Sequence, residues 1–332
     1  MQPLRQITVI GGGSWATALV KIFSESDITV HWYLRSQQQV DYLLQYGRNS
    51  NYLSFLQLNI QKIQPTCNLD EAIHASEDIL FAVPSAYLES EISALDEDVL
   101  KDKQIYVSIK GVVPDHDCVP TEFLYKKFDI LISQVIVLAG PCHAEEIAMN
   151  RKTFLTVAGN NNAAVERMIT AITSPYLKVI NNGDPVGVEY AAILKNVIGI
   201  ACGIIKGMNY GDNFLAVIVS NAMREVKAFL EASDNHQRDI NDSAYFGDLL
   251  VTAYSEYSRN RTFGQMIGRG YSIPMAEGRM NMVAEGYPAV RGIYKLAKQF
   301  EVNMPIVNAT YRILYKQASP YNEFKLLESS LR

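Results

Sequence analysis

The segment that decides the expected fold is Ile7-Thr8-Val9-Ile10-Gly11-Gly12-Gly13-Ser14-Trp15-Ala16-Thr17-Ala18-Leu19. A short β-branched run is followed at once by glycines and then by helix-forming residues. Gly11 permits a tight turn, Gly13 lets the backbone approach a pyrophosphate, and Ala16 is small enough for the helix to pack on the strand. The bare N–H groups that begin such a helix attract phosphate. The segment therefore predicts a dinucleotide site, although an ordinary strand–turn–helix unit can carry the same glycines.

The composition indicates a globular enzyme without a general affinity for nucleic acid. The chain has 332 residues, of which 48% are hydrophobic and 20% charged, and its net charge is −5. This length accommodates two domains. Because there is no overall basic field, any anionic substrate must be held by a local cluster of cations.

Continuous apolar runs in the first half of the chain are typical of strands buried on both faces of a parallel sheet. The expected strands are Ile7–Ile10, Thr29–Leu34, Ile79–Val83, Ile105–Ile109, Val135–Leu138, Phe154–Val157 and Leu177–Ile180. Helical patterns lie between them, for example at Ser85–Leu95 and Ala163–Thr173. This alternation predicts a Rossmann-like doubly wound α/β domain over residues 1–185.

The pattern becomes helical after the turn-forming residues 181–185, which predicts an all-α domain over residues 186–332. The expected helices are Val186–Met208, Leu215–Glu231, Phe246–Tyr257, Met275–Ala284, Val290–Gln299, Met304–Tyr315 and Asn322–Leu331. The most apolar stretch, Asn196–Ile205, is too short to span a bilayer. The N-terminal residues lack the apolar core of a signal peptide.

Cysteine and histidine usage points to a cytoplasmic protein without a metal centre. The four cysteines have no C-x-x-C pairing, so we expect reduced thiols. The five histidines lack the spacing of metal ligands.

The second expected strand ends in Arg35-Ser36, where many dinucleotide folds place an acid for the ribose hydroxyls. Arg35 follows Ala16 by 19 positions and can pair with a 2′-phosphate, which favours NADPH over NADH. A solvated arginine at a strand end is the alternative. Farther on, Ser85 follows the third expected strand and is a candidate N-cap for the next helix.

Two lysines are candidates for the chemistry. Lys110 follows an expected strand end, where it is either a ligand contact or a surface residue. Lys195 lies in the long apolar helix, beside Asn196. Burial lowers the pKa of a lysine, which suits a general acid or base, whereas a lysine that snorkels into water would be only structural.

Later segments supply groups that could hold an anion. Ser258, Arg259 and Asn260 offer hydroxyl, guanidinium and amide donors that suit a phosphate dianion, although they could also be a polar helix end. Asp248 could orient Lys195 or accept a substrate hydroxyl. The turn after Gly140-Pro141 has backbone N–H groups free to meet a ligand.

Taken in order, these motifs resemble the bacterial NAD(P)-dependent glycerol-3-phosphate dehydrogenases over nearly the whole chain. Besides the glycine segment, the resemblance is carried by Val83-Pro84-Ser85, Lys110-Gly111, Gly140-Pro141, Ala144-Glu145-Glu146, Lys195-Asn196-Val197-Ile198, Gly247-Asp248-Leu249, Ser258-Arg259-Asn260-Arg261 and Glu285-Gly286-Tyr287. It implies reversible reduction of dihydroxyacetone phosphate to sn-glycerol 3-phosphate for glycerophospholipid synthesis. It also implies a homodimer and a nicotinamide cofactor, for which Arg35 favours NADPH with NADH possible. No metal is needed if a lysine supplies both charge and proton, and the absence of a metal-ligand cluster agrees with this.

The resemblance implies roles for individual residues. Lys195 exchanges the proton, and Lys110 and Asp248 orient it and hold the substrate. The implied substrate contacts are Lys110, Gly140, Cys142, Lys195, Asp248, Ser258, Arg259 and Asn260. The implied cofactor contacts are Gly11, Gly13, Ser14, Trp15, Ala16, Arg35, Ser36, Lys110, Ala144, Arg259, Val283 and Glu285.

The chain departs from the family pattern at Cys142-His143, in the helix segment 214–222 and at Pro288-Ala289-Val290. A thiol at position 142 donates a weaker hydrogen bond than a hydroxyl. Two alternatives stay open at this stage. One is another two-domain dehydrogenase, of the 2-hydroxyacid or ketopantoate type, and the other is a non-catalytic NADPH sensor, which would have been expected to lose Lys110 and Lys195.

Overall fold

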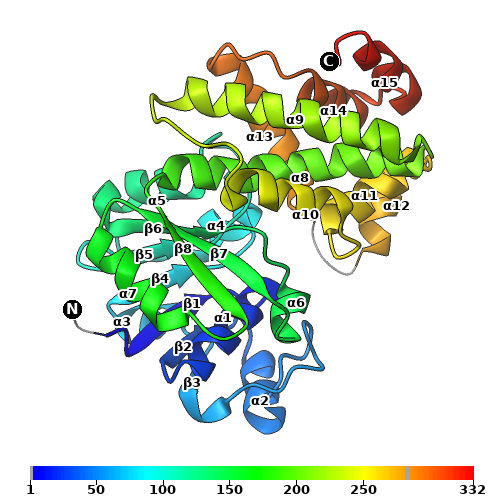
Figure 1. Cartoon of the computed structure of the whole chain (residues 1–332). Coiled ribbons are helices and arrows are strands. Elements are labelled where there is room, and N and C mark those ends of the chain that lie inside the picture. The colour runs from blue at the N-terminus through cyan, green and yellow to red at the C-terminus, as the bar shows by residue number, and fades with distance from the viewer. Residues whose placement is uncertain (1–2, 281–283) are drawn as a thin grey trace. The chain divides into compact units, whose positions relative to one another are not determined.

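Contacts divide the computed structural model, which describes residues 3–280 and 284–332, into two compact units (Figure 1). The first unit comprises Met1–Val83, Tyr87–Ile109 and Pro120–Pro185. The second comprises Pro84–Ala86, Lys110–Val119 and Val186–Arg332. Two short segments from the first half of the sequence thus belong to the second unit.

The first unit is built on one sheet with the strand order β3-β2-β1-β4-β5-β6-β7-β8. Its strands are β1 (Gln6–Ile10), β2 (Thr29–Tyr33), β3 (Ile63–Thr66), β4 (Asp78–Phe81), β5 (Gln104–Val107), β6 (Val135–Ala139), β7 (Thr153–Gly159) and β8 (Leu177–Asn182). Neighbours are parallel except β6 and β7, which are antiparallel. Apolar side chains of β1, β2 and β4 are fully buried, which confirms the expected doubly wound sheet.

Helices connect the strands of this sheet. They are α1 (Ser14–Glu25), α2 (Gln37–Tyr46), α3 (Leu69–His74), α4 (Ser85–Glu91), α5 (Pro120–Phe128), α6 (Ala144–Ala148) and α7 (Asn162–Ile172). The sequence did not predict β3. It pairs only with β2, and an edge strand tolerates Pro65, which cannot donate a ladder hydrogen bond.

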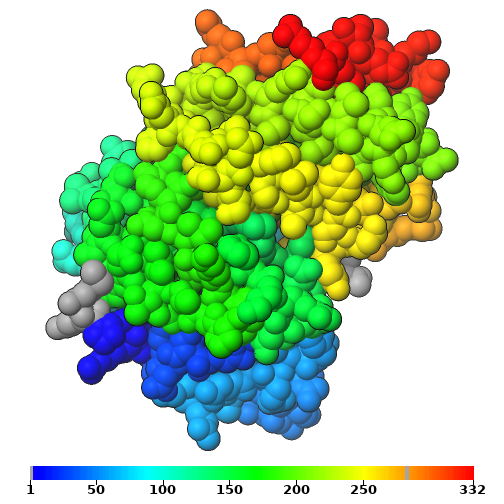
Figure 2. All heavy atoms as spheres, in the orientation of Figure 1, coloured from blue at the N-terminus to red at the C-terminus, as the bar shows by residue number. Residues whose placement is uncertain are grey.

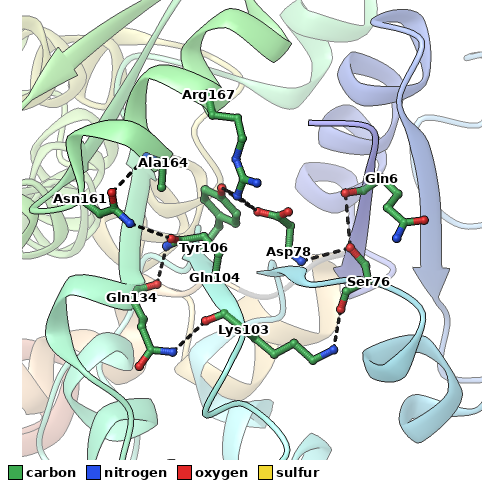
Figure 3. Close-up of polar contacts among 10 residues, drawn as sticks. All are labelled: Gln6, Ser76, Asp78, Lys103, Gln104, Tyr106, Gln134, Asn161, Ala164 and Arg167. Atoms are coloured by element: carbon green, nitrogen blue, oxygen red, sulfur yellow. Dashed lines mark hydrogen bonds and ion pairs between the residues drawn. The ribbon is translucent and has the colours of Figure 1, made fainter. Parts of the chain in front are cut away.

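A buried polar cluster ties together the amino ends of β4 and β5 (Figure 3). Arg167 reaches from α7 to form an ion pair with Asp78, and the Tyr106 hydroxyl donates to the same carboxylate at 3.0 Å. Burial raises the pKa of Asp78 although Arg167 opposes the shift. The cluster lies at the opposite strand ends from the glycine turn, so we regard it as structural.

The second unit is helical. Its helices are α8 (Pro185–Gly207), α9 (Gly211–Ser233), α10 (Asp248–Tyr254), α11 (Arg259–Gly268), α12 (Ile273–Arg279), α13 (Gly286–Gln299), α14 (Pro305–Lys316) and α15 (Pro320–Glu328). Asn221 of α9 exchanges two hydrogen bonds with the backbone of Arg332, so the C-terminal residue lies against α9. The red C-terminal segment lies beside the yellow-green α9 in Figure 2.

Helix α8 confirms the helix expected at Val186–Met208, shifted by one residue at each end. By length and hydropathy it is the one helix among the described residues that could cross a membrane. Its most apolar stretch of 18 residues is, however, entirely buried inside the protein. Such burial is typical of a core helix in a globular fold.

Two expected helices of this unit differ in the structure. The helix expected at 246–257 is a π turn, Ser243–Gly247, followed by α10, and it ends at Tyr254. The helix expected at 275–284 ends at Arg279. Helix α11 was not predicted.

Candidate active site

The glycine segment forms the turn that the sequence predicts. Gly11 has φ +131°, and a Cβ at this position would lie 2.6 Å from the carbonyl oxygen of Ala82. Gly13 precedes α1, and no side chain caps the first turn of that helix. A Cβ placed on Gly13 would meet none of the described atoms within 4 Å, apart from its chain neighbours. The turn therefore presents bare N–H groups to open space, as an anionic group requires.

Polar side chains surround the start of α1. The Ser14 hydroxyl is buried and has no hydrogen-bond partner among the described residues. The Trp15 indole N–H donates to the Ser108 hydroxyl at 2.8 Å, and Ser108 donates to the carbonyl of Leu138 at 2.8 Å. The start of α1 is thereby linked to the carboxyl ends of β5 and β6.

Asn49 holds this turn and was missed by the sequence reasoning. Its amide group donates to the Gly12 carbonyl at 3.0 Å and to the Thr17 hydroxyl at 2.8 Å. Ala16 is fully buried, in keeping with its expected packing role. No local motif around Asn49 revealed these contacts, because they join positions more than 30 residues apart.

The proposed ribose end of the site is exposed. Arg35 follows β2 and is solvent-exposed, and Ser36 caps α2 by accepting a 3.4 Å hydrogen bond from the Gln39 N–H. An exposed arginine at the end of β2 can reach an anionic group of a bound ligand.

The segment after β6 carries three further residues of interest. Gly140 and Cys142 lie in the turn between β6 and α6, and Ala144 begins α6 and is buried. The Cys142 thiol is 3.1 Å from the carbonyl oxygen of Gly140, to which it donates. This local contact occupies the thiol in addition to any role toward a ligand.

Lys195 is buried in α8 and forms an ion pair with Asp248. Lys195 is 6% exposed and Asp248 is 1% exposed, so the ammonium does not snorkel into solvent. A buried ammonium is stable only when a partner compensates its charge. The second carboxylate oxygen of Asp248 has no partner among the described residues, which leaves it available to orient another group.

The backbone of Lys110 is hydrogen-bonded to α8, the helix that carries Lys195. The side-chain amide of Asn196 donates to the Lys110 carbonyl at 2.8 Å. Because Asn196 is adjacent to Lys195, the two lysines come from segments joined at one point of α8. The sequence showed only that Asn196 follows Lys195.

The half-buried carboxyl group of Glu285 interacts electrostatically with these cations. Burial raises the pKa of Glu285, while the charges of Arg259, Lys110 and Lys195 act to lower it. The four groups therefore share one electrostatic environment within the helical unit.

The Ser258-Arg259-Asn260 segment begins α11. Ser258 is the N-cap, and its hydroxyl accepts a 3.3 Å hydrogen bond from the Arg261 N–H. The side-chain carbonyl of Asn260 accepts from the Gly286 N–H at 2.8 Å. These residues are thus a helix start as well as a donor cluster.

Helices α8 and α11 touch through their backbones. A Cβ at Gly203 would lie 2.1 Å from the Arg261 carbonyl oxygen, and one at Gly264 would lie 2.1 Å from the Ile200 carbonyl oxygen. Such contact requires glycine on both helices. It brings the start of α11 close to the helix that carries Lys195.

The structure corrects the expectation for Ser85. Ser85 is not an N-cap: α4 begins at Ser85 itself, and the hydroxyl has no partner among the described residues. Val283 lies outside the described residues. Within residues 3–280 and 284–332, no group of three or more metal-ligating side chains could hold a metal ion.

Two family models match the chain. The N-terminal model of NAD-dependent glycerol-3-phosphate dehydrogenase matches residues 6–165, and the C-terminal model of the same enzyme matches residues 184–325. Together they cover both units.

Curated relatives agree with the family models. A glycerol-3-phosphate dehydrogenase [NAD(P)+] from Staphylococcus carnosus is 32% identical and covers 98% of both chains. One from Clostridium botulinum strain Alaska E43 is 34% identical over 96% of this chain and 95% of the relative.

Solved structures agree as well. The glycerol-3-phosphate dehydrogenase of Coxiella burnetii has a TM-score of 0.92, 26% identity and coverage of 98% of this chain and 99% of its own. A ketopantoate reductase family structure from Ralstonia eutropha has a TM-score of 0.57 and 15% identity, with coverage of 93% and 97%, and shares the fold alone.

Proposed function

Because the chain belongs to the NAD-dependent glycerol-3-phosphate dehydrogenase family, we propose that it interconverts dihydroxyacetone phosphate and sn-glycerol 3-phosphate with a nicotinamide cofactor. The observation that carries this proposal is the buried Lys195–Asp248 ion pair, beside which Lys110, Arg259 and Glu285 share one environment. The product would supply glycerophospholipid synthesis. We also propose that the protein is a cytoplasmic homodimer. The free cysteines support the cytoplasmic location, because thiols stay reduced there.

The first unit contains groups that suit the cofactor. Gly11, Gly13 and the uncapped start of α1 would hold its diphosphate, with Ser14 and Trp15 beside them. We propose that Arg35 and Ser36 favour the 2′-phosphate of NADPH, with NADH a weaker substitute. Ala144 and, in the second unit, Lys110, Arg259, Val283 and Glu285 are proposed contacts by resemblance. When bound, the cofactor supplies or accepts a hydride.

Lys195 would donate the proton that the substrate oxygen gains when the ketone is reduced, and it would accept that proton from the hydroxyl when the alcohol is oxidised. The carboxylate of Asp248 balances the charge of the buried ammonium and orients it. Negative charge develops on the ketone oxygen as reduction proceeds, so nearby cations stabilise the transition state more than the ground state. Lys195 and Lys110 supply those cations.

The other end of the substrate would be held by the start of α11. Ser258, Arg259 and Asn260 combine hydroxyl, guanidinium and amide groups in one turn, a set that suits a phosphate dianion. Gly140 and Cys142 are additional substrate contacts proposed by resemblance alone.

The proposal is tested by comparing NADPH oxidation with dihydroxyacetone phosphate and with unphosphorylated dihydroxyacetone. We expect a strong preference for the phosphorylated ketone, and we expect Arg259→Ala to remove most of that preference. Arg269→Ala is the matched control, because Arg269 is exposed at the other end of α11. Equal rates on the two ketones would refute a phosphate-binding role for the cluster.

A further inference from the structure

The segment that begins with Lys110 folds as a small closed loop, which we call the strap (residues 110–119). Val113 and Cys118 form an antiparallel bridge, with the Val113 N–H donating to the Cys118 carbonyl at 3.0 Å. Asp115 and Asp117 turn the chain with φ values of +65° and +48°. The strap belongs to the helical unit, although it follows β5 in the sequence.

The strap rests on α13 at a position where only glycine fits. A Cβ at Gly292 would lie 2.6 Å from Val112 Cγ1, 2.7 Å from its Cβ and 2.9 Å from its Cγ2. Val112 is 3% exposed, so its side chain is buried against the bare backbone of Gly292. Carbon atoms in ordinary contact are about 3.5–4.0 Å apart. An added methyl group at position 292 would therefore displace the strap by about 1 Å.

Two cations of α13 form ion pairs with Asp115 and Asp117 of the strap. The Lys295 ammonium donates to both carboxylate oxygens of Asp117, at 2.9 and 2.7 Å. One turn earlier, Arg291 lies 3.7 Å from the carboxylate of Asp115. Gly292 lies between these two cations along the helix, so the apolar and ionic contacts act on one surface.

The start of the strap and the start of α13 both contact residues of the candidate active site. At the start of the strap, the Lys110 carbonyl accepts from Asn196. At the start of α13, the Gly286 N–H donates to Asn260, and the neighbouring Glu285 shares the electrostatic environment of Lys110. The position of the strap on α13 thus sets the distance of Lys110 from the groups around Glu285.

We propose that Gly292 and Val112 are positioning residues that act on catalysis through Lys110. This inference rests on the proposed function, because it assumes that Lys110 contacts the bound ligands. A displacement of about 1 Å at a group that acts on the reacting atoms can lower the rate by about 100-fold. Neither Gly292 nor Val112 contacts a ligand in this proposal.

The test is Gly292→Ala, assayed with NADPH and dihydroxyacetone phosphate. We expect kcat/KM to fall at least tenfold at a temperature where circular dichroism shows that the variant is folded. Gly278→Ala is the matched control: it also adds one methyl group to a helix, but apart from that helix's own backbone no described atom lies within 4 Å of the added carbon. We expect its kcat/KM to stay at the wild-type value.

Two further variants separate positioning from general loss of structure. Val112→Gly in the Gly292→Ala background removes the clashing side chain, and we expect it to recover most of the lost kcat/KM. In a Lys110→Ala background, Gly292→Ala should cause no further loss, because the group it positions is already gone.

The outcomes distinguish this inference from the proposed function. Wild-type kcat/KM for Gly292→Ala, a loss that Val112→Gly does not relieve, or a further loss in the Lys110→Ala background would each overturn the positioning role. Wild-type activity of Lys110→Ala would instead refute the role that the proposed function gives to Lys110.

Discussion

The buried ion pair offers the sharpest perturbation, which is Asp248→Asn. This change conserves size but removes the charge that compensates Lys195, which is only 6% exposed. For unit charges about 4 Å apart at an effective dielectric constant of about 20, the lost attraction is about 4 kcal/mol. Removal of one partner from a buried pair typically costs about 3–5 kcal/mol, which agrees with this figure.

Two consequences of Asp248→Asn can be measured separately. If the lost energy falls on the transition state, about 4 kcal/mol corresponds to a decrease in kcat/KM of about 1,000-fold. The charged form of Lys195 also becomes less favourable, so the alkaline limb of the pH profile for ketone reduction should move to lower pH. The assay is steady-state NADPH oxidation with dihydroxyacetone phosphate between pH 5.5 and 9.5.

Asp78→Asn is the matched control for this variant. It breaks another buried ion pair, with Arg167, but in the first unit and at the amino ends of the strands. We expect lower thermal stability with an unchanged pH profile of the folded enzyme. An Asp248→Asn variant that kept wild-type kcat/KM and its alkaline limb would refute the reasoning.

Two other changes test separate parts of the molecule. Arg35→Asp should shift the ratio of kcat/KM values from NADPH toward NADH at least tenfold, because the exposed guanidinium is the proposed partner of the 2′-phosphate; an unchanged ratio would remove that role. Glu225 accepts hydrogen bonds from the N–H groups of Ile306 and Val307, and burial raises its pKa to about 8. The folded protein then holds a proton that the unfolded chain releases above its ordinary carboxyl pKa, so this group lowers stability progressively as pH rises from about 4.5 to 8. Glu225→Gln should reduce the fall in thermal midpoint between pH 6 and 8.5, and an equal fall in both proteins would show that Glu225 does not cause it.

The sheet was predictable where burial leaves a continuous apolar run. The residues of β1 and β4 carry such runs, and the structure places both in the middle of the sheet. The short β3 contains Pro65 and has only one neighbour, so its sequence lacks that pattern. Helix α11 was missed because its first turn, Arg259-Asn260-Arg261, is polar. The sequence analysis interpreted this segment as a donor cluster or as the polar end of a helix, whereas Ser258 caps the start of a new helix.

The candidate site was predictable as a set of residue types but not as a set of contacts. Lys195 was conspicuous because a charge in an apolar helix needs a partner, and the structure supplies Asp248. The contacts of Asn49 and Asn196 join distant parts of the chain, and no local spacing announces them. The grouping of the strap with the helical unit likewise depends on its packing against Gly292.

Substitution of Lys195 by alanine, followed by single-turnover reduction of dihydroxyacetone phosphate with NADPH, tests the central claim most directly. Cofactor binding is measured on the same variant by fluorescence titration. We expect the rate of reduction to fall by at least 1,000-fold while the cofactor affinity stays within about threefold of wild type, because the ammonium serves the substrate oxygen. Reduction at a near-normal rate by the folded variant would contradict the assignment of the proton to Lys195.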